Sequence, residues 1–205
     1  MKAPGKGPLV ALIASVIFVG DVVTKYLAVA KLTFTFTAVG ADTFGARVAA
    51  FLSQHHLYER GLTTRPFIVL ENFAQFVYAE NPGAAFSFLA SAGAGFRVPF
   101  FHLITVAAVV FISLYLRKLH EDQRLLQIAL ALLLGGALGN GLDRLLRGYV
   151  IDFIDWHWFD PNWLVPARHW PTFNVADCGV SVGLVLLFLE MFLAPKPAAP
   201  HPERA

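Results

Sequence analysis

Charged residues are scarce in this sequence. Asp, Glu, Lys and Arg make up 15% of its 205 residues, whereas a soluble domain carries about a quarter. Hydrophobic residues account for 57%, and this imbalance argues against a soluble enzyme and predicts a membrane protein. The formal net charge of +2 is too small to indicate a nucleic-acid partner.

Cysteine is nearly absent, and so are metal-binding signatures. Cys178 is the single cysteine, so no disulfide can form within the chain. His157 and His169 are too far apart in the sequence for a recognised ligand spacing, and the His55–His56 pair indicates no metal by itself. Internal repeats are also lacking. No metal site is therefore predicted.

The sequence does contain four long apolar runs, each close to the roughly 20 residues that a membrane-spanning helix needs. They predict an all-α integral membrane protein with one membrane-embedded domain, residues 1–194. The predicted spans are residues 9–30, 96–116, 125–142 and 175–194. The predicted loops are residues 31–95 and 143–174, and residues 195–205, rich in Pro and Ala, are expected to form a flexible tail.

The first run has a second possible interpretation. Lys2 and Lys6 precede it, and the small residues at 28–30 form a passable cleavage site, so it could be a secretory signal peptide.

Basic residues near the ends of the spans indicate the orientation. In a four-span arrangement these residues lie on one side: Lys2, Lys6, Arg117, Lys118, Arg124, Lys196 and Arg204. The positive-inside rule makes that side cytoplasmic. Both termini are therefore expected to face the cytoplasm.

Polar residues that are unusual in membrane segments gather at the opposite interface. Asp21 and Lys25 lie in the outer half of the first span, and Asp177 opens the fourth. The third span ends in Asn140, Asp143 and Arg144. A carboxylate at the hydrocarbon boundary is costly unless it is paired or hydrated, so this one-sided set indicates a functional site.

Structural explanations remain open for several of these features. Asp21 and Lys25 are four residues apart, so they could simply neutralise one another on one helix face. The sequence Asn81-Pro82-Gly83 is by itself a turn signal. Small residues at four-residue spacing, which predict close helix packing, are Gly135, Gly139, Gly179 and Gly183.

Asp152 and Asp177 are the candidate catalytic pair. Asp152 lies among β-branched and aromatic residues in VIDFIDWHWFDPNW (150–163), which are expected to raise its pKa. All four tryptophans lie within residues 156–170, which predicts a loop along the membrane surface. Two carboxylates a few ångströms apart cannot both ionise comfortably, so one keeps a proton while the other can activate water, as in aspartic proteases.

Neighbouring polar residues could support this chemistry. Asn174 lies three residues before Asp177 and would present its amide beside that carboxylate on a helical turn. Asn81 and Asn140 could orient a substrate or stabilise an oxyanion. The pairs that could form charge-neutralised supports are Arg144 with Asp143 and Lys25 with Asp21.

Four blocks of the sequence resemble lipoprotein signal peptidase (signal peptidase II), the intramembrane aspartyl protease family of the bacterial inner membrane. The blocks are DVVTKYLA from Asp21, ENPGAAFSFL from Glu80, GGALGNGLDRLLRGYVIDFID from Gly135 and FNVADCGVSVG from Phe173. They occur in the family's order. The resemblance implies that Asp152 and Asp177 are the catalytic dyad. The implied supporting or substrate-binding residues are Asn81, Gly83, Asn140, Arg144, Asn174, Asp143, Asp21 and Lys25.

The resemblance also implies a substrate and a setting. The substrate is a prolipoprotein that carries diacylglycerol on its lipobox cysteine and is cut just before that cysteine. Membrane lipid is the implied surrounding partner, and no metal or organic cofactor is implied. A monomer in the bacterial inner membrane is expected, with its active site near the periplasmic face. A small β-like periplasmic platform is expected in residues 66–88.

Two segments depart from the family pattern. Residues 31–65 are longer than expected and could form an extra periplasmic amphipathic helix or a lid, and residues 158–171 also look expanded. Neither changes a motif residue, but both could alter substrate access.

Two other functions compete with a protease. A small transporter or proton channel would also carry ionisable residues within membrane helices. A membrane assembly protein could bind lipidated chains without cutting them. A proton path needs acidic groups at several depths, whereas here they gather at one face, with only Glu190 near the inner end of the fourth span. The protease interpretation is therefore favoured.

Overall fold

Four long helices dominate the computed structural model, which describes residues 5–83, 89, 92–158 and 168–193. They are α1 (Lys6–Leu32), α4 (Ala94–Lys118), α5 (Arg124–Arg147) and α6 (Val175–Leu193). Each is long and apolar enough to cross a membrane. The prediction of four spanning helices in an integral membrane protein is therefore confirmed, while the predicted tail at 195–205 lies outside the described residues.

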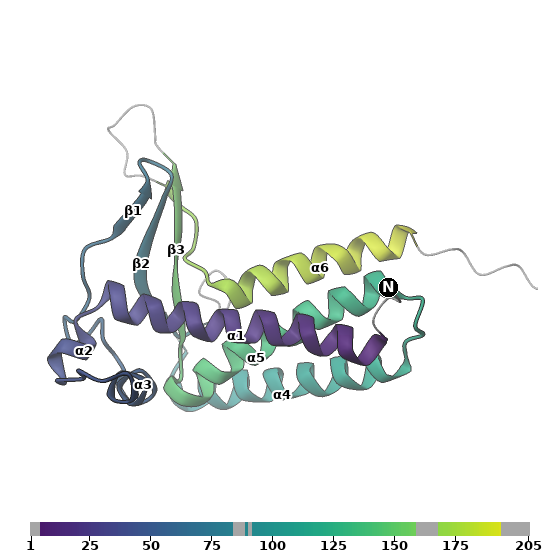
Figure 1. The fold of residues 1–205 in the computed structure, drawn as a ribbon, viewed down its shortest axis with the longest axis horizontal. Coiled ribbons are helices and arrows are strands. Elements are labelled where there is room, and N and C mark those ends of the chain that lie inside the picture. Colours follow the sequence, from purple (N-terminus) through teal and green to yellow (C-terminus); the bar gives the residue numbers. More distant parts are fainter. Residues whose placement is uncertain (1–4, 84–88, 90–91, 159–167, 194–205) are drawn as a thin grey trace, which may run out of the picture.

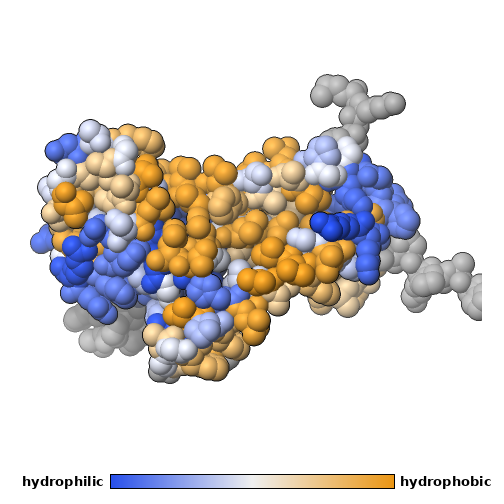
Figure 2. All heavy atoms as spheres, turned by 90° about the horizontal axis from the view of Figure 1, so that it is seen from below, coloured by the Kyte–Doolittle hydropathy of each residue, from blue (hydrophilic) through white to orange (hydrophobic). Residues whose placement is uncertain are grey.

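The helices lie side by side and share one long axis (Figure 1). Helix α5 contacts α1, α4 and α6 and has the most buried residues, whereas α1, α4 and α6 expose large apolar side chains such as Leu12, Phe111 and Phe188. Figure 2 shows apolar side chains over the middle of the molecule and hydrophilic ones at the end that holds the α4–α5 connection. This distribution suits a helix bundle surrounded by hydrocarbon.

Helix α1 is an integral part of this bundle. Its Ala14 and Ile17 pack against Gly135 of α5, and its Asp21 and Lys25 are fully buried between helices. A signal peptide that is removed cannot supply such contacts, so the alternative interpretation of the first run is not supported.

Helix α5 continues beyond the predicted end of its span. It ends at Arg147 and is capped by Gly148, whose φ of 75° lets its N–H donate to the carbonyl of Arg144. Asp143 and Arg144 therefore lie on the last turns of a helix.

Glycines bring α5 close to α1 and α6. The four glycines predicted to do so, Gly135, Gly139, Gly179 and Gly183, all lie at helix contacts. Gly136 is the tightest position, because a Cβ there would lie 2.5 Å from the carbonyl oxygen of Ala176 and 2.7 Å from Cγ2 of Val180. The backbones of α5 and α6 can approach this closely only because the side chain is missing.

Replacing Gly136 with alanine is expected to destabilise the protein by about 1–3 kcal/mol, since the added methyl group forces α6 away from α5. Thermal unfolding in detergent measures the effect. The matched control is Gly95→Ala, where a Cβ would meet no described atom within 4 Å. Equal melting temperatures for the two variants would contradict the close packing.

A four-stranded antiparallel sheet stands across one end of the bundle (Figure 1). Its strands, in spatial order, are β1 (Phe67–Leu70), β2 (Ala74–Asn81), β3 (Val150–Trp158) and β4 (Arg168–His169). Strands β1 and β2 fall within the predicted platform at 66–88, of which residues 84–88 lie outside the described part.

The prediction of an all-α protein with a small β-like platform left out part of the sheet. Strands β3 and β4 come from residues 143–174, which were predicted to form a loop. Strand β3 pairs with β2, so that Ala79 faces Asp152 and Asn81 faces Val150. The long sequence separation of these partners hid the pairing from local patterns. Residues 159–167 of the expanded segment lie outside the described residues.

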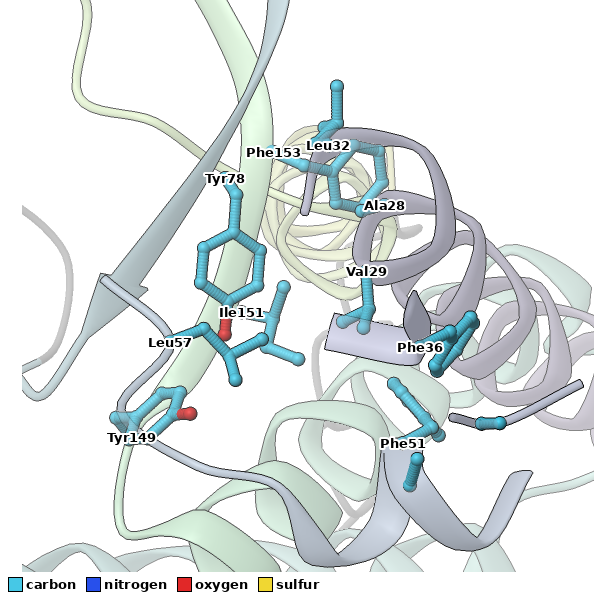
Figure 3. Close-up of a cluster of buried hydrophobic side chains, with 12 residues drawn as sticks. Ala28, Val29, Leu32, Phe36, Phe51, Leu57, Tyr78, Tyr149, Ile151 and Phe153 are labelled. Atoms are coloured by element: carbon cyan, nitrogen blue, oxygen red, sulfur yellow. The ribbon is translucent and has the colours of Figure 1, made fainter. Parts of the chain in front are cut away.

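The long first loop folds against the sheet and the end of α1. It contains α2 (Thr35–Ala38) and α3 (Phe44–Ser53), and α3 is the extra helix expected in residues 31–65. Figure 3 shows the resulting core, in which Val29 of α1, Phe51 of α3 and Ile151 of β3 point toward one another. Glu80 of β2 fixes the connection by accepting the backbone N–H of Leu57 at 2.7 Å.

Candidate active site

Asp177 is held by the first turn of α6. Asn174 precedes the helix, and its side-chain oxygen accepts the N–H of Asp177 at 3.0 Å. In return, Oδ2 of Asp177 accepts the N–H of Asn174 at 3.2 Å. This reciprocal pair is a capping box with aspartate in the usual place of glutamate. The same contacts that begin the helix therefore fix the carboxylate of Asp177.

Asp152 lies in the middle of β3 and is 1% exposed. The side-chain amide of Asn81, its diagonal neighbour on β2, donates to Oδ2 of Asp152 at 3.0 Å. The Asn81 side-chain oxygen accepts the N–H of Gly83 at 3.0 Å, which closes the turn after β2. Asn81 and Gly83, both predicted site residues, thus position the carboxylate of Asp152.

Two asparagines join the aspartates. The side-chain amide of Asn174 donates to Oδ1 of Asp152 at 2.7 Å, while its backbone N–H binds Asp177. Asn140 of α5 donates to Oδ1 of Asp177 at 2.8 Å, and its side-chain oxygen accepts from Asn174 at 3.1 Å. The structure therefore brings Asp152 and Asp177 into one hydrogen-bonded group with residues from four elements.

A buried ion network lies directly behind this group. Nζ of Lys25 is 2.7 Å from Asp21, 2.8 Å from Asp143 and 3.0 Å from the side-chain oxygen of Asn140. Asp21 also accepts the N–H of Ala176 at 2.9 Å, one of the N–H groups that α6 cannot satisfy within its own first turn. Lys25 thereby links α1 to α5 and, through Asp21, to the beginning of α6.

Of the two predicted supporting pairs, Lys25 with Asp21 is confirmed at 2.7 Å, whereas the partner predicted for Arg144 needs correction. Asp143 pairs with Lys25 and with Arg147, whose Nη1 lies 2.7 Å away, and not with Arg144. Arg144 instead donates to the carbonyl of Gly83 at 3.0 Å and lies over the ring of Phe101. The reason is helix periodicity, because position 147 shares a face with position 143 whereas position 144 is rotated by about 100°.

Arg147 was therefore missed by sequence reasoning, although its four-residue spacing from Asp143 was visible. Asp143 also accepts the backbone N–H of Ile151 at 3.1 Å. Because Ile151 precedes Asp152, this bond fixes the register of β3 relative to α5.

A cavity of about 700 Å³ opens onto both aspartates. One wall consists of Trp156, Trp170 and Phe173, which lie near the sheet, and the other includes Val182 and Leu184 of α6. Val182 and Leu184 are half exposed on the apolar surface of the bundle. The cavity therefore connects a polar end to the hydrocarbon-facing side of a helix.

The electrostatics of this cavity favour a single proton on the pair. Burial, followed by the negative charge of Asp177, raises the pKa of Asp152 to about 7. The hydrogen bonds from Asn81 and Asn174 and the charge of Lys25 oppose this rise. Near neutral pH, one of the two carboxyl groups can thus be protonated while its neighbour is ionised.

Asp152 and Asp177 lie close together at the polar end of a bundle of four apolar helices. This arrangement is typical of membrane-embedded proteins that have an acid–base site. Residues 13–193 match the family model described as signal peptidase (SPase) II. The chain belongs to this family, and it is a peptidase.

Relatives and solved structures agree with this assignment. A lipoprotein signal peptidase of Anaeromyxobacter sp. (strain Fw109-5) is 48% identical over 90% of this chain and 85% of its own. Another, of Pseudomonas syringae pv. tomato, is 44% identical over 69% and 78%. A solved bacterial membrane enzyme, determined by the in meso method at 2.3 Å resolution, is 25% identical over 96% of this chain and 95% of its own, with a TM-score of 0.65.

The comparisons favour the protease over the transporter. They agree with the predicted family and with a multi-pass bacterial membrane protein. The candidate residues gather at the sheet end of the bundle.

Proposed function

We propose that this protein is a lipoprotein signal peptidase that uses Asp152 and Asp177 as its catalytic dyad. One observation supports the proposal most strongly. Asn174 donates its backbone N–H to Asp177 and its side-chain amide to Asp152, so it holds both carboxylates at the edge of one cavity. Relatives bearing the name lipoprotein signal peptidase support a lipoprotein precursor as the substrate class. The resemblance of the sequence blocks implies that the lipobox cysteine of this precursor already carries diacylglycerol.

The dyad acts as a general acid and base. The ionised carboxylate takes a proton from a water molecule, which attacks the carbonyl carbon of the peptide bond before the lipidated cysteine. The protonated carboxyl group donates a hydrogen bond to the carbonyl oxygen, where negative charge develops. The tetrahedral intermediate then collapses: the C–N bond breaks, and the dyad passes the proton taken from water to the departing amino group of the lipidated cysteine. Asn81, Asn140 and Asn174 hold the two carboxyl groups at fixed positions, so that little reorganisation accompanies the reaction.

The cavity suits a substrate that is partly lipid. The acyl chains can remain in the bilayer beside Val182 and Leu184, whose exposed apolar side chains border the cavity. The scissile peptide then reaches Asp152 and Asp177 at the polar end. A substrate anchored in this way is delivered to the dyad without leaving the membrane.

The proposed setting is the bacterial inner membrane, with both termini in the cytoplasm and the sheet at the periplasmic face. Basic residues at the opposite end of the bundle, including Lys6, Arg117 and Lys118, support this orientation. The proposed state is a monomer, as the resemblance implies.

The function is tested with purified protein in liposomes and a synthetic precursor, offered with and without diacylglycerol on the cysteine. We expect cleavage before the cysteine of the lipidated precursor only. Cleavage of both forms at the same rate would overturn the proposed substrate class, and proton flux without any cleavage would favour a channel.

The pH profile of cleavage is expected to have an alkaline limb with a midpoint near pH 7. The pKa of Asp152 is raised to about 7, so the dyad loses its shared proton above that pH and kcat/KM should fall about tenfold per pH unit. The charged groups that act on Asp152 are Asp177, Lys25 and Arg144.

Asn81→Ala should move this alkaline limb to higher pH, because Asn81 stabilises the ionised form of Asp152 through its hydrogen bond. Ser181→Ala, a change elsewhere in the same cavity, is the control and should leave the limb in place. A limb that does not move in Asn81→Ala, or that moves to lower pH, would contradict the assignment to Asp152.

A further inference from the structure

A second group of polar side chains lies on the face of β3 that points away from the dyad cavity. Asp155 and His157 are two residues apart on the strand, so their side chains project from one face. Asp152 and Trp156, which line the cavity, belong to the other face. His169 of β4 is the direct cross-strand partner of His157. Strand pairing thus brings together three groups that can bind a metal.

The distances within this group are close to those of a coordination sphere. One ligand atom from each of Asp155, His157 and His169 lies within 4.8 Å of the other two. Nδ1 of His169 is 2.9 Å from Oδ1 of Asp155, and Nδ1 of His157 is 3.9 Å from Oδ2. Zinc bonds of about 2.1 Å place tetrahedral ligands about 3.4 Å apart. Small side-chain rotations are enough to reach this spacing.

An unsatisfied buried nitrogen points to a ligand. Nδ1 of His157 is inaccessible to solvent and has no hydrogen-bond partner among the described residues, and such a group is costly unless something binds it. It lies beside the Asp155 carboxylate, which is 4% exposed. The imidazole of His169 is half exposed, so an ion has a route from solvent.

The carboxylate already has a residue that orients it. Gln75 of β2, the cross-strand partner of Asp155, donates from its side-chain amide to Oδ2 at 2.5 Å. The other carboxylate oxygen, Oδ1, is in hydrogen-bond contact with Nδ1 of His169 at 2.9 Å, a contact that a shared ion would replace. Metal ligands are commonly fixed by outer hydrogen bonds of this kind.

We propose that Asp155, His157 and His169 bind one Zn²⁺ ion, with water completing a tetrahedral sphere. Two imidazoles and one carboxylate suit Zn²⁺, whereas Mg²⁺ and Ca²⁺ prefer oxygen ligands alone. The ion has no part in the hydrolysis by Asp152 and Asp177, because the side chains of its ligands point to the opposite face of β3.

The ion would link β3 to β4 by binding His157 of one strand and His169 of the other. Among the described residues, these strands pair at two positions, His157 with His169 and Trp158 with Arg168. The next residue, Trp170, donates its N–H to the carbonyl of Trp156 at 2.7 Å, and both indoles border the dyad cavity. Fixing His169 to His157 therefore fixes one wall of the cavity.

The test is a titration of ZnCl2 into the full-length, untagged protein in detergent. Calorimetry measures the binding, and hydrogen exchange at the backbone N–H of Trp170 measures its structural effect. We expect one ion per chain and slower exchange at Trp170 when Zn²⁺ is present. Co²⁺ in place of Zn²⁺ should give the visible absorption of a tetrahedral site. His157→Ala and His169→Ala should each weaken binding by more than about tenfold, and Gln75→Ala by about tenfold or more.

His120→Ala is the matched control, because His120 is exposed at the opposite end of the bundle and its loss should leave Zn²⁺ binding unchanged. Binding of equal strength in wild type and in a His157→Ala/His169→Ala double variant would overturn the proposal. So would the absence of Zn²⁺ binding by a wild-type protein that cleaves its substrate. Neither result would affect the dyad.

Discussion

Cleavage of a lipidated precursor is expected to fall by about 10³-fold or more when either Asp152 or Asp177 is replaced with asparagine. Asparagine retains the size and much of the hydrogen bonding of aspartate but cannot carry the proton or the charge. A positioned acid or base contributes about 10²–10⁴-fold, and each replacement disables both steps because the two groups share one proton. Single-turnover kinetics in liposomes measure this loss.

The same variants should still bind the precursor and retain their melting temperature within a few degrees. Asp42→Asn is the control, since Asp42 is an exposed carboxylate in the first loop, and full activity is expected. A protein that binds lipidated chains without cutting them would respond to none of these changes. Normal turnover by either dyad variant would refute the proposed mechanism.

Replacing Lys25 with methionine is expected to destabilise the protein by about 3–5 kcal/mol, the usual cost of leaving a buried charge without its partner. Lys25 is 1% exposed and lies between Asp21 and Asp143. Asp143 would keep its partner Arg147, but Asp21 would be left with the N–H of Ala176 alone. Chemical unfolding in detergent measures the change in free energy.

A second variant separates lost charge pairing from lost packing. Adding Asp21→Asn to Lys25→Met removes the uncompensated carboxylate, so part of the stability should return. Lys31→Met, an exposed position at the end of α1, should cost less than about 1 kcal/mol. If Lys25→Met were as mild as Lys31→Met, the buried network would not hold the helices together.

The sequence predicted the four helices and pointed to the candidate site residues, because both leave local signals. Apolar runs of sufficient length located α1, α4, α5 and α6. Asp152 and Asp177 were recognisable because a carboxylate among apolar neighbours is costly without a function. The position of Asn174 three residues before Asp177 suggested their contact on a helical turn, and the capping box is that contact.

The contacts between distant segments could not be predicted in the same way. Asn81 reaches Asp152 only because β2 pairs with β3, and nothing in either segment specifies that pairing. For the same reason, the eleven residues between His157 and His169 argued against a shared ligand, although the strands place the two side chains opposite one another. Sequence separation is a poor guide to distance across an antiparallel sheet.

If Asp152 and Asp177 act as one unit, the cleavage rate of the double variant Asp152→Asn/Asp177→Asn will show it. Groups that share one function are strongly non-additive. The double variant should therefore cleave no more than about threefold slower than the slower single variant. A rate reduced by the product of the two single effects would mean that the aspartates act independently, and it would contradict the shared site.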